Sequence, residues 1–339
     1  MQIKTIFGLA ALAGLSTFAA PASAQVGLDW IRYYSVAAGS PGIFSGSEEN
    51  WLGVTGDDAG NVIVCGYSSL ASGAATQIDI IVRKYDPAGA IVWTYQKDVS
   101  GFFDFARAVV CDASNDVYIC GETEYNAART DSDGVITKIN GATGAEIWQR
   151  IVLNAPAGGS PDDGFYDICV ARNGSAVYGA QDWSTAVATN YAMGITRTNG
   201  AGVVSWTNVI DGAGSPTGYD QMRKVRLAPN GDVIGMGLTR HTGIDADARM
   251  VRYTPAGATV YNTVYSNNGV FAGANDVFFD LAVDSTGAAV MAGRSQDSAA
   301  ITSATAVKIG PAGALVWQNR FNPNATFSAT DMWWNSAYC

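Results

Sequence analysis

Residues 58–66 read Asp-Ala-Gly-Asn-Val-Ile-Val-Cys-Gly, and residues 81–93 read Ile-Val-Arg-Lys-Tyr-Asp-Pro-Ala-Gly-Ala-Ile-Val-Trp. Each stretch joins a run of β-branched residues to a turn rich in Gly, Pro, Asn or Asp, which is the pattern of paired β-strands. The pattern returns in four later stretches, residues 113–121, 136–148, 229–237 and 307–317. Self-similarity of this kind indicates a repeat architecture.

An aromatic residue near the end of each repeat sets the repeat length at about 56 residues. These anchors are Trp93, Trp148, Trp206, Tyr261 and Trp317. Each repeat holds four short β-rich runs, which is the size and pattern of a four-stranded antiparallel propeller blade. Runs such as residues 62–64 are β-branched on both faces, as expected for sheets packed between other sheets. We therefore predict an all-β chain without helices, a β-propeller with five full blades.

The two ends of the chain predict one more, incomplete blade. Residues 29–34 resemble a fourth strand with its Trp, and residues 331–339 align with the first strand of the last full copy, residues 276–284. Together they would form a composite blade that closes the ring. Because the sequence stops after that first strand, two alternatives stay open. Either the last blade is two-stranded, or the chain is truncated at its C-terminus.

Composition narrows the classes of partner. Only 15% of the residues are charged and 39 are Gly, which argues against a coiled coil or a charged disordered chain, and the 48% hydrophobic content is ample for a core. The net charge is −10 and the isoelectric point is about 4.5. Such an acidic chain is not expected to bind nucleic acid or an anionic membrane surface.

The first 24 residues have the features of a secretory signal peptide. Lys4 precedes an apolar run over residues 6–20, and Ala22-Ser23-Ala24 gives the small-x-small cleavage pattern. We therefore expect a single propeller domain over residues 25–339 that is secreted, periplasmic or on the cell surface. An uncleaved membrane anchor is the alternative, although the run is shorter than the ~20 residues that span a bilayer. No later stretch is long enough to span one.

The five cysteines do not resemble a disulfide framework, because their odd count leaves at least one unpaired. Cys65 and Cys120 occupy the same place in successive repeats, and Cys111 and Cys169 lie in apolar runs. We expect these four to pack as buried thiols. Cys339 is the last residue. No Cys-x-x-Cys motif occurs and the chain has one histidine, so a zinc-type site is not indicated.

The repeat resembles a known group of families. The Asp/Asn-Gly turn with Val-Ile-Val-x-Gly, followed by residues 84–93, is similar to the bacterial β-propeller repeats known as SBBP or delta-60 repeats. The resemblance covers about residues 49–320, and the third copy is degraded at residues 197–206. It implies a propeller that is secreted or on the surface, and no particular activity. Residues 140–148 are also similar to the repeats of quinoprotein dehydrogenases and outer-membrane assembly propellers. A quinone cofactor is not expected, because those enzymes resemble larger propellers with adjacent cysteines.

One acidic residue recurs in each repeat, eleven residues before the first turn. The positions are Glu49, Asp104, Asp163, Asp220 and Asp276, with Asp331 in the partial copy. If they begin the innermost strands, six carboxylates would circle one mouth of the channel and could bind a hard cation such as Ca²⁺. The alternative is structural, with each carboxylate accepting hydrogen bonds from turn N–H groups. Asp79 and Asp133, just before the third strand in two copies, are also expected to be structural.

The loops between the second and third strands, about eleven residues each, are expected on the same face as these acids. Loops on a rigid scaffold commonly carry binding residues. Four of their side chains could stack on a sugar or peptide or anchor the loops: Tyr125, Trp183, Tyr191 and His241.

The sequence favours a binding or scaffold module for a polysaccharide, a cell-surface component or a protein partner. It lacks Gly-x-Ser-x-Gly, His-Glu-x-x-His and P-loop motifs. Two alternatives stay open. One is a hydrolase that uses a pair of carboxylates, as glycosidases do, and the other is a structural surface protein without a small ligand.

Overall fold

The computed structural model describes residues 49–68, 78–124, 132–152, 163–184, 191–211, 220–240, 246–266, 275–298 and 301–321. Within these ranges the chain forms twenty strands in five four-stranded sheets and no helix. No described segment is therefore a long apolar helix of the kind that crosses a membrane. The prediction of an all-β chain with five full blades is confirmed.

Each sheet corresponds to one sequence repeat, and its four antiparallel strands follow one another in chain order. The first blade contains β1 (Glu49–Gly56), β2 (Val62–Ser68), β3 (Asp79–Tyr85) and β4 (Ile91–Lys97). The second contains β5 (Asp104–Cys111), β6 (Val117–Glu124), β7 (Ser132–Ile139) and β8 (Glu146–Val152). The third contains β9 (Gly164–Val170), β10 (Ala176–Ser184), β11 (Tyr191–Asn199) and β12 (Val204–Ile210). The fourth contains β13 (Gln221–Leu227), β14 (Val233–Arg240), β15 (Ala246–Tyr253) and β16 (Thr259–Tyr265). The fifth contains β17 (Asp276–Val283), β18 (Ala289–Ser298), β19 (Ile301–Ile309) and β20 (Leu315–Phe321).

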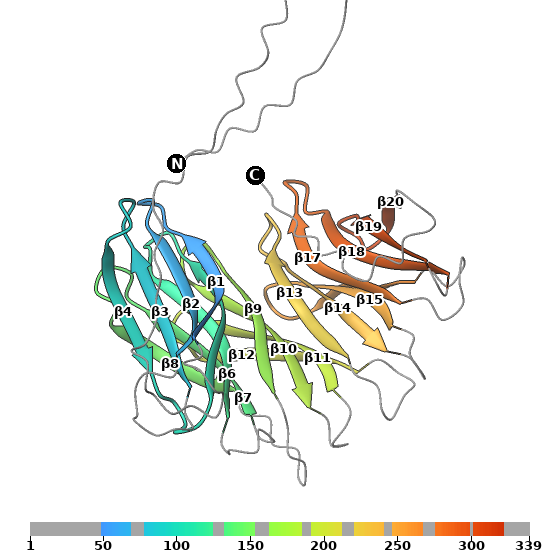
Figure 1. Cartoon of the computed structure of the whole chain (residues 1–339). Helices are drawn as coiled ribbons and strands as arrows, with labels where there is room; N and C mark the ends of the chain where they lie inside the picture. The colour runs from blue at the N-terminus through green and yellow to red at the C-terminus, as the bar shows by residue number, and fades with distance from the viewer. Residues whose placement is uncertain are drawn as a thin grey trace, which may run out of the picture.

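The blades are arranged as in a β-propeller. The first strands of consecutive blades, β1, β5, β9, β13 and β17, contact one another and form an inner wall (Figure 1). The fourth strands lie outermost, and the side chains of β20 are almost all exposed. Residues 29–34 and 331–339, which we expect to form the incomplete blade, lie outside the described residues.

The middle strands explain why the repeats are rich in β-branched residues. Every side chain of β3 and of β6 is buried, and the two faces of β6 pack against the first and third blades. Ile63, Ile80 and Ile119 meet in one apolar cluster between the first and second blades. Two apolar faces on one strand are therefore a direct consequence of blade stacking.

The aromatic anchors join each blade to the next. Trp93 Nε1 donates a hydrogen bond of 3.0 Å to the carbonyl oxygen of Gly141, in the outer turn of the second blade. Trp148 makes the same 3.0 Å bond to Gly200 of the third blade. The turn that receives Trp93 contains Gly144 with φ of 75°, and a Cβ there would lie 2.9 Å from the indole ring. The aromatic anchor thus recurs at the repeat length because each blade makes one such contact with the next.

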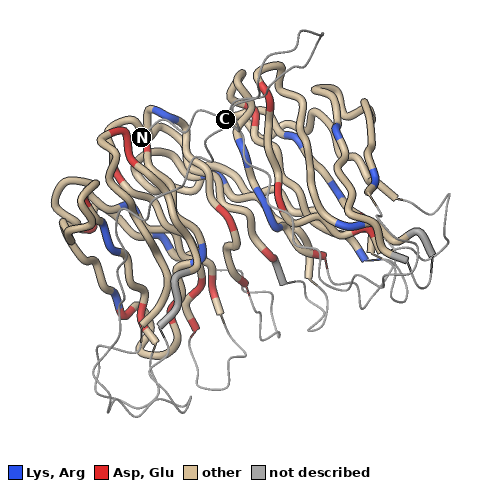
Figure 2. The backbone as a smooth tube through the Cα atoms, turned by 45° about the horizontal axis from the view of Figure 1, so that its top comes forward, with Lys and Arg blue, Asp and Glu red and all other residues tan. Residues whose placement is uncertain are grey.

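Charged residues follow the same repeat, and acidic and basic residues are interspersed over the blades (Figure 2). Lys84 Nζ lies 2.7 Å from a carboxylate oxygen of Asp57, and Lys308 Nζ lies 2.7 Å from one of Asp284. In these two blades the lysine stands near the end of the third strand and the acid begins the turn between the first two strands. The carboxylates of Asp57 and Asp284 are therefore neutralised within their own blades.

The described cysteines are unpaired. Cys65, Cys120 and Cys169 are buried and Cys111 is half-buried, in agreement with the expected packing role. Burial raises the pKa of the Cys65 thiol far above its usual range and that of Cys111 to about 12. These thiols are consequently protonated near neutral pH and are poor nucleophiles.

Candidate functional site

Each innermost strand carries a β-bulge at the same place. The strand pairing skips one residue per blade, and these residues are Leu52, Arg107, Tyr166, Arg223 and Phe279. A bulge redirects a side chain away from the regular alternation of the strand. The five blades therefore present side chains of four kinds, one leucine, two arginines, one tyrosine and one phenylalanine, from equivalent positions on the inner wall.

Bulge residues of neighbouring blades contact one another. The Cζ atom of Arg107 lies 4.8 Å from the ring centroid of Tyr166, and that of Arg223 lies 5.4 Å from the ring centroid of Phe279. Both distances are typical of cation–π pairs. Arg294 approaches the Phe279 ring as well, at 6.0 Å. The inner wall thus carries arginine and aromatic side chains in a chain whose net charge is negative.

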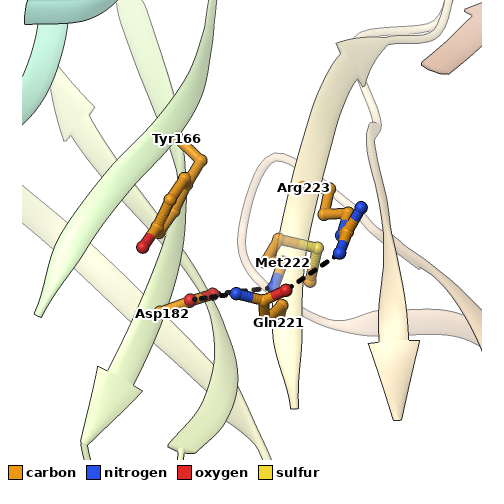
Figure 3. A pocket seen from close by; sticks show the side chains of 5 residues that line it. All are labelled: Tyr166, Asp182, Gln221, Met222 and Arg223. Carbon is orange, nitrogen blue, oxygen red and sulfur yellow. Dashed lines mark hydrogen bonds between the residues drawn. The ribbon is translucent and has the colours of Figure 1, made fainter. Parts of the chain in front are cut away.

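A pocket of 280 Å³ lies between the third and fourth blades, lined by Tyr166, Asp182, Gln221, Met222 and Arg223 (Figure 3). Asp182 accepts hydrogen bonds from Met222 N at 3.0 Å and from Gln221 Nε2 at 3.3 Å. Arg223 Nη2 donates to Gln221 Oε1 at 3.0 Å. The carboxyl and amide groups form a floor that links the two blades, with Tyr166 and Arg223 on either side of it.

The floor of the pocket has an unusual electrostatic state. Asp182 is 2% exposed, and burial raises the pKa of its carboxyl to about 8. The negative charge of Glu122 raises this pKa further, whereas the two hydrogen bonds and Arg223 oppose the shift. Glu122 forms an ion pair with Arg107. Near neutral pH the Asp182 carboxyl is therefore mostly protonated, and it can hydrogen-bond hydroxyl groups without adding a negative charge.

The recurring acids lie at the beginning of the innermost strands. Glu49, Asp104 and Asp276 are the first residues of β1, β5 and β17, and Asp163 and Asp220 directly precede β9 and β13. The four aspartates are buried. The side chain of Glu49 and the whole of Asp331 lie outside the described residues.

Several of these aspartates accept hydrogen bonds from their surroundings. Val99 N donates to Asp104 Oδ2 at 2.6 Å, and Arg240 N donates to Asp220 Oδ1 at 2.9 Å. The hydroxyl of Ser295 donates to Asp276. Two of these bonds come from backbone N–H groups and one comes from a side-chain hydroxyl. Both interpretations of the recurring acid, the structural one and the cation site, stay predictions.

At Asp104 the structure adds two further carboxylates. One carboxylate oxygen from each of Asp79, Asp98 and Asp104 lies within 4.8 Å of the corresponding oxygens of the other two. Burial raises the pKa of Asp79 to about 6, and the charges of Asp98 and Asp104 act in the same direction. The sequence reasoning assigned Asp79 a structural role and missed Asp98. The available signal was the position of Asp98, directly after the fourth strand and six residues before Asp104.

The structure places two of the four expected loop residues in strands. Trp183 and Tyr191 belong to β10 and β11 and not to a loop, because the two strands remain paired as far as Ser184 and Tyr191. The carbonyl oxygen of Tyr191 accepts a 2.9 Å hydrogen bond from Asp220 N, which joins the third blade to the fourth. The Trp183 side chain, Tyr125 and His241 lie outside the described residues. The pocket residues were not predicted from the sequence.

No protein-family model matches the chain, and no curated protein matches its sequence. Similar solved structures include a eukaryotic initiation factor, at 13% identity and a TM-score of 0.43, with 81% of this chain and 55% of that one covered. The chain thus spans little more than half of that structure. A protein from Lactobacillus plantarum is 13% identical, with a TM-score of 0.45 and coverage of 79% and 68%. An α-L-arabinofuranosidase from Fusarium graminearum, in complex with an iminosugar inhibitor, is 8% identical, with a TM-score of 0.45 and coverage of 77% and 88%. None of these likenesses bears on function.

Proposed function

We propose that the protein is a binding module that holds one sugar-sized group of a polysaccharide in the pocket between the third and fourth blades. One observation carries this proposal. Tyr166 and Arg223 flank a hydrogen-bonded floor made by Asp182 and Gln221. An aromatic ring offers a flat apolar surface to a sugar, and the surrounding polar groups offer donors and acceptors to its hydroxyls.

The size and location of the pocket support this ligand class. A volume of 280 Å³ is close to the lower end of the usual range for ligand pockets, so it suits one small group and not a folded partner. Tyr166 and Arg223 each follow one of the recurring aspartates, Asp163 and Asp220, by three residues. The pocket therefore lies toward the end of the inner wall at which β9 and β13 begin.

The proposed location of the protein supports the same class. We place the protein outside the cytoplasm, on the strength of the signal-peptide pattern in residues 1–24 and the resemblance to secreted propeller repeats. Polysaccharides and surface components are abundant in that compartment. An arginine at the pocket favours sugars that carry a carboxylate over neutral ones.

Calorimetric titration of the full chain with a neutral xylan oligosaccharide and with an oligogalacturonate tests the proposal. Arg223→Gln and Tyr166→Ala should each weaken binding of the preferred sugar at least about tenfold, the equivalent of roughly 1.4 kcal/mol. Arg294→Gln is the matched control, because Arg294 stacks on Phe279 and does not line the pocket. Equal losses in the Arg223 and Arg294 variants, or no binding of either sugar, would contradict a sugar site here and favour a structural surface protein.

A second candidate function is a carboxylate-based hydrolase. The specific observation is that Asp182 is held protonated while the charge of Glu122 contributes to its raised pKa, which is the arrangement of a general acid beside a second carboxylate. Release of reducing ends from the same oligosaccharides distinguishes the two functions. A hydrolase should lose turnover in Asp182→Asn and keep its affinity, whereas a pure binding module shows no turnover in the first place.

A further inference from the structure

We propose that Asp79, Asp98 and Asp104 bind a hard divalent cation, Ca²⁺ in preference to Mg²⁺, at the junction between the first and second blades. The three carboxylates converge from the start of β3, the residue after β4 and the start of β5. This cluster lies at a different blade junction from the sugar pocket, and the cation site does not depend on that pocket.

Among the described residues, no lysine or arginine compensates the charges of this cluster. None of the three aspartates forms an ion pair with a lysine or arginine within the described ranges. Elsewhere in the blades, acids such as Asp57 and Asp284 have a lysine 2.7 Å away. Asp79 and Asp104 are 1% and 0% exposed, so their mutual repulsion is poorly screened. A bound cation would supply the missing positive charge.

Two buried oxygen atoms, one in the cluster and one beside it, have no hydrogen-bond partner among the described residues. Asp79 Oδ2 accepts a 3.2 Å bond from Gln96 Nε2, but the buried Oδ1 of the same carboxylate has no partner among the described residues. Ser68, directly opposite Asp79 in the strand pairing, is fully buried, and its Oγ also has none. Directly opposed residues have Cβ atoms only about 5 Å apart on the same face of a sheet. Unpaired buried oxygens are costly, and a cation is a group that would satisfy them.

The connection from β4 to β5 already holds two of the ligands in place. Gly101 N donates to Asp98 Oδ1 at 2.7 Å, and Val99 N donates to Asp104 Oδ2 at 2.6 Å. Asp104 N donates to the carbonyl oxygen of Ile78 at 2.8 Å, which ties this connection to the first blade. Ca²⁺ accepts six to eight oxygen ligands in flexible geometry, so three carboxylates, a hydroxyl and water molecules suit it better than Mg²⁺.

The other blade junctions show that the full set of carboxylates is specific to this one. The strand pairing identifies the equivalent positions in each later blade. The second junction has Asp133, Leu153 and Asp163, the third has Ala192, Asp211 and Asp220, and the fourth has Asp247, Ser266 and Asp276. A framework role alone would need no third acid, so the extra carboxylate of Asp98 points to a ligand.

Thermal melting of the full chain with Ca²⁺, with Mg²⁺ at the same concentration and with chelator tests the proposal. We expect Ca²⁺ to raise the melting temperature by a few degrees, the effect of a ligand well above its dissociation constant, and chelator to reverse the rise. Asp98→Asn should abolish the rise. The Asp98 side chain is exposed, so this variant should fold. Asp211→Asn is the matched control, because Asp211 is also exposed and holds the equivalent place opposite Ala192.

A calcium-dependent rise in the wild type and in the Asp211 variant, and none in the Asp98 variant, supports the site. Three results overturn it. The wild type shows no shift in Ca²⁺, or the Asp98 and Asp211 variants respond equally, or Mg²⁺ produces the same rise in every protein. The last result would show general screening of the acidic chain. Equilibrium dialysis with Ca²⁺ gives a readout independent of stability, with one equivalent expected for the wild type and none for Asp98→Asn.

Discussion

The protonated carboxyl of Asp182 makes the stability of the protein depend on pH in a defined way. Its pKa is raised from 3.8 to about 8 in the folded chain. Between these two values the folded state holds a proton that the unfolded state has released. Stability should therefore fall as the pH rises from about 4 to about 8 and be constant outside this window with respect to this group.

The substitution Asp182→Asn removes the titration and keeps the shape of the side chain. A pKa difference of one unit corresponds to about 1.4 kcal/mol, so a shift from 3.8 to about 8 amounts to a free energy of about 6 kcal/mol. The stability of the variant, relative to the wild type, should thus increase by about 1.4 kcal/mol per pH unit across the window. The exposed fraction of Asp182 is 2%, so solvent screening does not reduce this value appreciably.

Urea unfolding of both proteins at several pH values across this window measures the difference directly. Asp211→Asn is the control for the general effect of removing one acid, because the Asp211 side chain is exposed. Its stability relative to the wild type should not change by more than about 0.5 kcal/mol over the same range. A pH-independent difference between the wild type and Asp182→Asn would refute the argument, since it would mean that the carboxyl ionises normally in the pocket.

Two further predictions concern the framework. Trp148→Phe removes the hydrogen bond to the Gly200 carbonyl and should lower the free energy of unfolding, measured in urea, by about 1 kcal/mol. Trp317→Phe is the control, because this anchor is exposed and its substitution should have little effect. Equal losses in the two variants would contradict the interblade role. Gly121→Ala would place a Cβ 1.7 Å from the carbonyl oxygen of Phe105 and should prevent cooperative folding, as followed by circular dichroism melts. Gly56→Ala is the control, because the nearest atom to its Cβ would be 3.7 Å away and the substitution should be tolerated. A stable Gly121→Ala protein would show that β5 and β6 can move apart.

The blades were predictable because the stacking of blades requires a pattern of residues that repeats along the sequence. Strands that are buried on both faces favour β-branched residues, and the interblade tryptophans recur once per blade. The lengths of the loops between the second and third strands were less predictable. In the third blade the pairing of β10 with β11 continues to Ser184 and Tyr191, which shortens the loop. Nothing in composition signals that pairing continues through polar residues.

The bulges and the pocket were not predictable from the repeat. A bulge adds one residue to a strand without requiring a particular residue type, and the bulge positions carry residues as different as Leu52, Arg107 and Phe279. The raised pKa of Asp182 also depends on burial between two blades and on the nearby charge of Glu122. Both conditions arise from residues far apart in the chain.

The contrast between recurring and varying positions indicates where ligand contacts lie in this chain. The acid at the start of the innermost strand recurs, and Asp104, Asp220 and Asp276 accept hydrogen bonds from nearby backbone or hydroxyl groups. The position of Asp182, by contrast, is occupied in the other blades by Tyr67, Glu122, Leu238 and Arg294. The shared backbone holds these varied side chains in equivalent geometry, so that neighbouring blades can supply unlike groups to one pocket. The residues that distinguish one blade from the next therefore mark the candidate ligand contacts, Asp182 at the pocket and Asp98 beside the recurring Asp104.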